Sequence, residues 1–263
     1  MRNICMVVGY SGTPYNGFQT QPEGRTIQDE IQNALLKLTG ETIKINGSGR
    51  TDAGVHAKAQ VINFHTASKI PIERWCLALN SYLPQDIVFT DAREVNTEFN
   101  ARKSAKRKTY RYTINANRYP DVFMRDYQFH HPRKLDLPAM RLAAEALLGE
   151  HDFTSFCSTR SVKDSHVRTL FEVRLDVEPG SIPDKPDHGQ GIIHLYVTGS
   201  GFLYNMVRII AGTLLEVGEG KLRSSDLTHI LAAKDRSLSG PTAMPHGLML
   251  WKVEYDFDGN QEI

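Results

Sequence analysis

The segment Gly47-Ser48-Gly49-Arg50-Thr51-Asp52-Ala53-Gly54-Val55-His56-Ala57 lies between two expected strands in the first half of the chain. It holds one carboxylate among three glycines, with an arginine two residues before it. Glycine lets the backbone adopt conformations closed to other residues and approach a ligand closely. Asp52 is therefore either a residue that hydrogen-bonds its own backbone in a turn or a carboxylate presented for catalysis. The segment alone leaves both interpretations open.

The elements around this segment predict a β-α-β-β-α-β order, which is typical of a ferredoxin-like unit. Thr26 is a candidate N-cap with Asp29 three residues later, and Gly40 closes a helix of apolar residues at helical spacing. The other expected elements are strands over 3–10, 42–45, 58–65 and 87–92 and a helix opened by Pro71.

The second half of the chain repeats this pattern with insertions. We expect strands over 106–115, 166–177, 191–198 and 248–257, helices over 136–148, 201–217 and 226–233, and a loop over 179–189. The expected fold class is α/β (α+β), built from two related units with a boundary near Ser104. The expected domains are 1–104 and 105–263.

Composition narrows the classes of protein to which the chain can belong. It has 263 residues, of which 40% are hydrophobic and 23% charged, as in ordinary globular proteins. No apolar run reaches membrane-spanning length, and Met1 leads straight into an expected strand, so we expect no membrane segment and no secretory signal. The three cysteines, Cys5, Cys76 and Cys157, are far apart and indicate reduced thiols rather than disulfides or a zinc site. We therefore expect a cytoplasmic protein.

Basic residues gather in one stretch although the net charge is only +1. Residues 102–112 (RKSAKRKTYRY) combine Lys106, Arg107, Lys108 and Arg111 with two tyrosines and no acid. Basic residues interleaved with aromatic ones are typical of an RNA-binding surface. An edge strand protected by charged side chains has the same composition, so the two interpretations stand side by side.

One arginine lies in the most apolar expected helix, 201–217. Arg208 is the only basic residue there, and a helix that is apolar all round is buried. A buried guanidinium needs an acidic partner. Arg208 can form a structural ion pair, extend its head to solvent or orient a catalytic carboxylate, and the helix alone does not decide between them.

Three segments together resemble the TruA family of tRNA pseudouridine synthases. They are Gly49–Ala57 (GRTDAGVHA), Lys108–Tyr112 (KTYRY) and Gly201–Arg208 (GFLYNMVR). Residues 150–156 (EHDFTSF) and 232–236 (AAKDR) also resemble family segments, so the likeness spans nearly the whole chain in the same order.

The resemblance implies a pseudouridine synthase fold, with two ferredoxin-like units around a central mixed or antiparallel sheet. It implies an isomerase that converts uridine to pseudouridine at positions 38, 39 and 40 of the tRNA anticodon arm. It also implies a homodimer that binds tRNA and uses no metal and no organic cofactor.

The resemblance assigns roles to four residues. Asp52 is the nucleophile, which attacks the uracil ring, attacks C1′ or deprotonates the sugar. Tyr110 stacks on the flipped base and can take part in proton transfer, unless it is a core-facing strand residue. Arg208 forms an ion pair with Asp52. Arg50 is associated with the space that the flipped base leaves, and a phosphate contact or plain exposure is its alternative.

Two other functions fit parts of the pattern. A non-catalytic RNA-binding module would have no need of Asp52, Tyr110 and Arg208 together. A glycosidic hydrolase needs two cooperating carboxylates, and Asp52 has no acidic companion in its segment. For His56 we expect a structural hydrogen bond rather than a metal. The polar loop 158–168 is either an RNA contact or a solvated loop.

Overall fold

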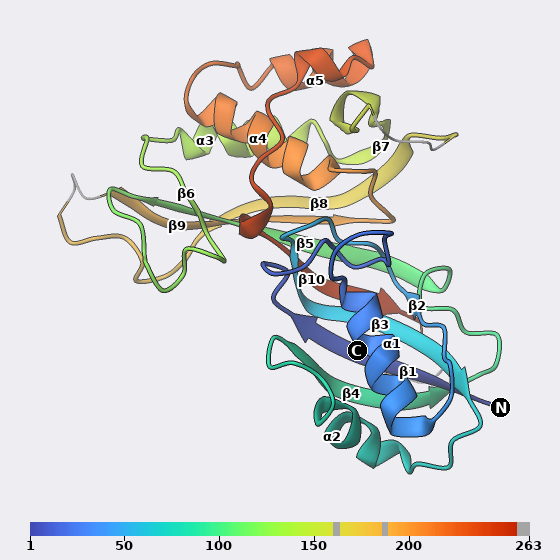
Figure 1. The fold of residues 1–263 in the computed structure, drawn as a ribbon. Coiled ribbons are helices and arrows are strands. Elements are labelled where there is room, and N and C mark those ends of the chain that lie inside the picture. The colour runs from blue at the N-terminus through green and yellow to red at the C-terminus, as the bar shows by residue number, and fades with distance from the viewer. Residues whose placement is uncertain (160–163, 186–188, 257–263) are drawn as a thin grey trace. The chain divides into compact units, whose positions relative to one another are not determined.

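A computed structural model describes residues 1–159, 164–185 and 189–256. By its contacts the chain divides into two compact units (Figure 1). Unit 1 comprises Met1–Lys108 and the chain from Met249 onward, and unit 2 comprises Thr109–Leu248. The expected domains were 1–104 and 105–263, whereas residues 105–108 and those from Met249 onward belong to unit 1. The last strand, β10 (Leu248–Tyr255), pairs in parallel with a strand of unit 1.

Unit 1 has the predicted β-α-β-β-α-β order. Strand β1 is antiparallel to both β3 and β4, and the short β2 pairs with β3. The elements are β1 (Arg2–Tyr10), α1 (Ile27–Thr39), β2 (Asn46–Gly47), β3 (His56–Thr66), α2 (Trp75–Asn80) and β4 (Ile87–Val95). The resulting strand order β4-β1-β3-β2 is that of a ferredoxin-like sheet, and α1 lies across it in Figure 1.

The caps predicted for the first helix are confirmed. The Thr26 hydroxyl oxygen accepts a hydrogen bond from the Asp29 N–H at 3.3 Å. Gly40 ends the helix in the left-handed region at φ 74°. The sequence therefore sets both ends of α1 locally.

Two predictions in this half are wrong in detail. Residues 42–45 form no strand, although Ile43 and Ile45 are buried in alternation with exposed neighbours, because strand pairing with β3 begins only at Asn46. The helix opened by Pro71 is a 3₁₀ turn (Ile72–Arg74) followed by α2, which ends at Asn80. The Asn80 side-chain nitrogen donates to the Phe89 carbonyl in β4 at 2.9 Å, and the Phe89 N–H donates to the Asn80 side-chain oxygen at 2.8 Å. A tertiary contact therefore holds this end of the helix.

Unit 2 places helices against the strands that follow β4 in the chain. Its strand order is β5-β9-β8-β7, and β6 pairs with β5. The elements are β5 (Ala105–Asn117), β6 (Phe129–His130), α3 (Leu137–Glu145), β7 (Gly149–Asp152), β8 (Val167–Val177), β9 (Gly189–Gly199), α4 (Met206–Gly218) and α5 (Asp226–Ala233). Helix α3 contacts both α4 and β8. The short strands β6 and β7 were not predicted, because two to four residues show no periodicity.

The long helix of unit 2 begins five residues later than predicted. Asn205 has φ 61°, a left-handed conformation that cannot continue a right-handed helix, and α4 starts at Met206. Gly201–Tyr204 therefore precede the helix, so Phe202 lies outside its apolar face. Short polar residues such as Asn tolerate this conformation, which makes Asn205 the local cause.

The predicted mixed α/β class is confirmed, because parallel and antiparallel strand pairs occur with helices against them. No helix in the described ranges is long and apolar enough to cross a membrane. Of the expected strand 248–257, residue 257 lies outside the described residues, as do 160–163 and 186–188 of the two expected loops.

Candidate functional site

Asp52 lies in unit 1, in the loop between β2 and β3. Asp52 is half-buried. Arg50, two residues before it, and Ala53, the next residue, are exposed. The Val55 N–H donates to the Asp52 carbonyl at 3.1 Å, and Gly54 has φ 76°. The backbone of Asp52 is thus part of a tight turn that requires a glycine two residues later.

Hydrogen bonds fix the loop before Asp52. The Ser48 N–H donates to the Val61 carbonyl at 2.7 Å, and the Ser48 hydroxyl donates to the Gln60 side-chain oxygen at 2.5 Å. The Gln60 amide donates in turn to the Gly49 carbonyl at 3.0 Å. Gln60 is fully buried, so its bond with the Ser48 hydroxyl lies away from solvent.

A second set of bonds fixes the loop immediately at Asp52. The Thr51 hydroxyl lies 2.8 Å from the hydroxyl of Tyr10, and the Thr51 carbonyl accepts from the Phe18 N–H at 3.0 Å. Tyr10 is 5% exposed, and burial raises the pKa of its hydroxyl well above the ordinary value. Tyr10 therefore stays neutral and acts as a hydrogen-bonding anchor.

A neighbouring loop, residues 12–18, packs against the back of the Asp52 loop. A side chain at Gly12 would collide with the Val55 carbonyl, and one at Gly17, which has φ +87°, would lie 2.8 Å from the Thr51 carbonyl. The Gly54 N–H donates to the Tyr15 carbonyl at 3.3 Å. Sequence reasoning missed this loop; its two glycines were the available signal.

His56 makes the predicted structural hydrogen bond. Its Nδ1 accepts from the Gly12 N–H at 3.0 Å, and the residue is 1% exposed. The bond joins the two loops. Among the described residues, no three His, Cys, Asp or Glu side chains are grouped so that they could hold a metal ion.

The basic residues of β5 have different environments. Lys106 and Arg107 are exposed, and Lys106 lies 3.3 Å from the Asp256 carboxylate. Arg111 is half-buried. Lys108 donates to the Ser48 carbonyl of the Asp52 loop at 2.5 Å, so its head is directed into unit 1.

Tyr110 meets the third motif within unit 2. Its ring packs edge-on against Phe202, with centroids 5.0 Å apart and an interplanar angle of 86°. Tyr110 is 8% exposed. Tyr112, two residues later, is fully buried and donates from its hydroxyl to the Met244 carbonyl at 2.9 Å. The structure thus brings two of the three sequence motifs into contact.

Arg208 lies in the first turn of α4 and is half-buried. Its Nε donates to the Ala243 carbonyl at 2.7 Å, and its Nη1 donates to the side-chain oxygen of Asn205 at 3.0 Å. The Ala243 N–H donates back to the Arg208 carbonyl at 3.1 Å. These bonds hold the side chain in place, and the ion pair with Asp52 stays a prediction.

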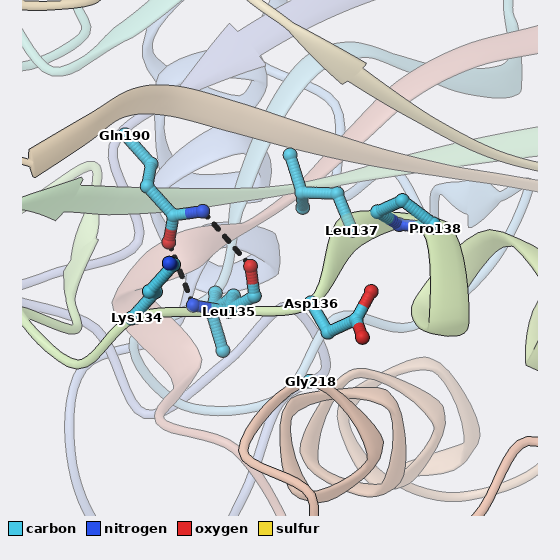
Figure 2. Close-up of a pocket in the computed structure, with 7 residues that line it drawn as sticks. All are labelled: Lys134, Leu135, Asp136, Leu137, Pro138, Gln190 and Gly218. Carbon is cyan, nitrogen blue, oxygen red and sulfur yellow. Dashed lines mark hydrogen bonds between the residues drawn. The ribbon is translucent and has the colours of Figure 1, made fainter.

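The predicted site residues fall into two groups. Unit 1 holds Asp52, Arg50 and Lys106 to Lys108, and unit 2 holds Tyr110, Arg111 and Arg208. A surface pocket near the start of α3, shown in Figure 2, contains none of them. There the Gln190 side-chain oxygen accepts a hydrogen bond from the Leu135 N–H at 2.6 Å, and the Gln190 side-chain nitrogen donates to the Leu135 carbonyl at 2.8 Å. These two bonds hold the segment before α3 in place.

Comparison with known proteins gives consistent matches. Residues 6–104 and 143–256 match a family model described as tRNA pseudouridine synthase. The tRNA pseudouridine synthase A of Bacillus subtilis is 46% identical over 258 residues, which cover 97% of this chain and 100% of that protein. The proteins of the same name from Caldicellulosiruptor saccharolyticus and an Exiguobacterium species are 46% and 48% identical, again over 97% of this chain.

Proposed function

The chain belongs to the tRNA pseudouridine synthase family, which consists of isomerases, and we propose that it converts uridine to pseudouridine at positions 38, 39 and 40 of the tRNA anticodon arm. The single observation that carries the proposal is the geometry of the Asp52 loop. Hydrogen bonds fix this loop on both sides of Asp52, while Arg50 and Ala53 remain exposed. Such a loop can present a carboxylate in a fixed position to a nucleotide.

The reaction breaks the C–N glycosidic bond, turns the uracil and forms a C–C bond to the same sugar. A carboxylate can serve as the nucleophile of such a reaction, and we assign this role to Asp52. Its attack on the ring, its attack on C1′ and its removal of a sugar proton are all compatible with a fixed carboxylate. The enzyme must also retain the detached uracil between the two steps.

The target base is stacked in the anticodon arm, so it must be flipped into the enzyme. Stacking on an aromatic side chain offsets about 1–3 kcal/mol of the unstacking cost. We assign this role to Tyr110, which Phe202 holds edge-on. Its hydroxyl is also a candidate for proton transfer from C5.

Two arginines complete the proposed site. We propose that Arg208 pairs with Asp52, since bonds to Ala243 and Asn205 already orient its guanidinium. Exposed Arg50 lies two residues from Asp52 and is proposed to enter the space that the flipped base leaves.

The proposed partners are tRNA and a second copy of the chain. Exposed Lys106 and Arg107 and half-buried Arg111 are assigned to the RNA backbone. The proposed location is the cytoplasm, because the substrate is tRNA and the three cysteines are free thiols. Sedimentation of the purified protein tests the homodimer, and a monomer at micromolar concentration would contradict it.

The function is tested by tritium release from tRNA that carries [5-³H]uridine, because isomerisation replaces the C5 proton. Release with a new pseudouridine at positions 38 to 40 supports the proposal. Free uracil among the products would indicate a hydrolase, and tRNA binding without release would indicate a binding module. Mapping pseudouridine in tRNA from cells that lack the gene gives the same test in vivo.

A further inference from the structure

Strand β5 directs one of its lysines into the protein. Side chains two residues apart lie on the same face of a strand, and Lys106 and Lys108 therefore share a face. The side chain of Lys106 is 60% exposed, whereas Lys108 is half-buried and places its Nζ 2.5 Å from the Ser48 carbonyl. Lys108 is thus less available to an RNA phosphate than its neighbour.

The carbonyl that Lys108 binds belongs to a part of the loop that makes several other hydrogen bonds. The Ser48 N–H binds Val61, the Ser48 hydroxyl binds Gln60, and the Gly49 carbonyl also binds Gln60. Gln60 and Val61 come from β3, whereas Lys108 comes from β5. Lys108 therefore anchors Ser48 from a second strand, β5.

The hydrogen bond is assisted by the charge of the lysine. Such bonds are stronger than those between neutral groups. Burial, with a smaller effect of the Arg102 charge, lowers the pKa of Lys108 from 10.5 to about 8. On the other side of the anchor, Tyr255 interacts with Ser48, and Cys5 interacts with Tyr255; burial raises the pKa of both groups, so they stay neutral near pH 8.

We propose that Lys108 is a positioning residue for the isomerisation: it holds the backbone of the loop that carries Asp52, rather than binding the RNA. The inference rests on the proposed function. Ser48 lies four residues before Asp52, and Gly49 between them has no side chain to restrain its backbone. Loss of the Ser48 anchor therefore lets the loop shift, and a shift of about 1 Å in a reacting group can cost a factor of about 100 in rate.

The first test compares Lys108→Met with Lys106→Met in steady-state assays of tritium release. Lys108→Met is expected to lower kcat by about tenfold to a hundredfold and to leave the KM for tRNA within about twofold. Lys106→Met is expected to raise KM and to leave kcat nearly unchanged. A Lys108→Met protein with normal kcat, or with a raised KM alone, would overturn the inference.

Lys44→Met is the control for removal of a lysine as such, because Lys44 is exposed and outside the proposed site. Thermal unfolding of all variants shows whether a loss of kcat reflects loss of fold. If the unsubstituted protein releases no tritium, the proposed function is wrong. If it releases tritium and the Lys108→Met variant is equally active, the proposed function stands and the inference about Lys108 is wrong.

The second test uses pH. The kcat of the unsubstituted protein is expected to fall as pH rises through about 8, because Lys108 then loses its proton. Lys108→Met lacks this decline, and Lys108→Arg keeps its charge, so it recovers part of kcat and moves the decline to higher pH. The same decline in all three proteins would contradict the proposal.

Stability is expected to change in the opposite direction. Between pH 8 and 10.5 the unfolded chain binds the Lys108 proton and the folded chain does not, so the free energy of unfolding rises with pH relative to Lys108→Met. A loss of kcat together with this gain in stability separates positioning from general unfolding. If stability and kcat fall together over this range, the decline reflects unfolding and the inference is wrong.

Discussion

The contacts described above for the Asp52 loop and for the Tyr110–Phe202 pair differ in kind. Hydrogen bonds to its backbone and hydroxyl groups fix the loop in unit 1, with partners in β1, β3, β5 and the loop 12–18. Edge-to-face packing of two rings holds Tyr110 in unit 2. Directional bonds fix atoms closely, whereas apolar packing tolerates substitutions that conserve volume. The proposed nucleophile, Asp52, needs the first kind of support, and the second kind is adequate for the proposed stacking surface, Tyr110.

The largest effect is expected for Asp52→Asn, which keeps the size of the side chain and removes its charge. If Asp52 is the nucleophile, as proposed, tritium release should fall on the order of 10⁴-fold or more. The backbone bonds of the loop remain in this variant, and urea unfolding checks that the fold is retained. Asp52→Asn protein with full activity would rule out the assigned role, and single-turnover assays with excess enzyme set the detection limit.

Gly12→Ala should damage the loop without touching Asp52. The new methyl group meets the Val55 carbonyl, and the backbone must shift. We expect a loss of about 1–3 kcal/mol of stability, measured by urea unfolding, with a lower kcat because loop 12–18 supports Thr51.

Gly49→Ala is the matched control, because a methyl group there lies no closer than 3.8 Å to a neighbouring atom, the Lys108 Nζ. Its stability should stay within about 0.5 kcal/mol of the unsubstituted protein. Equal losses in the two variants would mean that close packing of the loops does not matter.

Phe202→Leu probes the apolar support of Tyr110. Loss of the edge-to-face contact should cost about 0.5–1.5 kcal/mol of stability. Without this contact the Tyr110 ring should stack less well on the flipped base in the proposed reaction, which lowers kcat by about tenfold or less. Tyr110→Phe keeps the contact with Phe202 and isolates the hydroxyl. If Phe202→Leu were as damaging as Gly12→Ala, the proposed difference between the two regions would not hold.

The smallest effect is expected for Lys106→Ala. Its exposed pair with Asp256 contributes little to stability, so unfolding should be unchanged. If Lys106 contacts a phosphate, the slope of the logarithm of tRNA affinity against the logarithm of salt concentration should decrease by about one. Filter-binding titrations at several salt concentrations measure it, and an unchanged slope would remove Lys106 from the RNA interface.

The sequence predicted those elements that local chemistry specifies. Thr26 and Gly40 define α1 because a cap and a left-handed glycine act within one turn of the helix. Alternating apolar residues located the long strands to within a few residues. The start of α4 was wrong because apolar spacing continues through Gly201–Tyr204, while the left-handed Asn205 interrupts the backbone there.

Within the site, the sequence identified Asp52, Tyr110 and Arg208 as candidates through motif order, and it gave His56 its structural bond. It could not show that Lys108 binds Ser48 whereas Lys106 faces solvent, since both belong to the same basic stretch. Nor could it show that Phe202 supports Tyr110 or that loop 12–18 supports Thr51.

The sequence by itself determined the family and the order of the longer elements, and it supplied the candidates for the chemistry, because these depend on side-chain type and short spacing. Only the tertiary structure decided which lysine anchors the Asp52 loop and which glycines let a second loop pack behind it. Those contacts join residues far apart in the chain, and their geometry depends on where the packed strands place each backbone carbonyl.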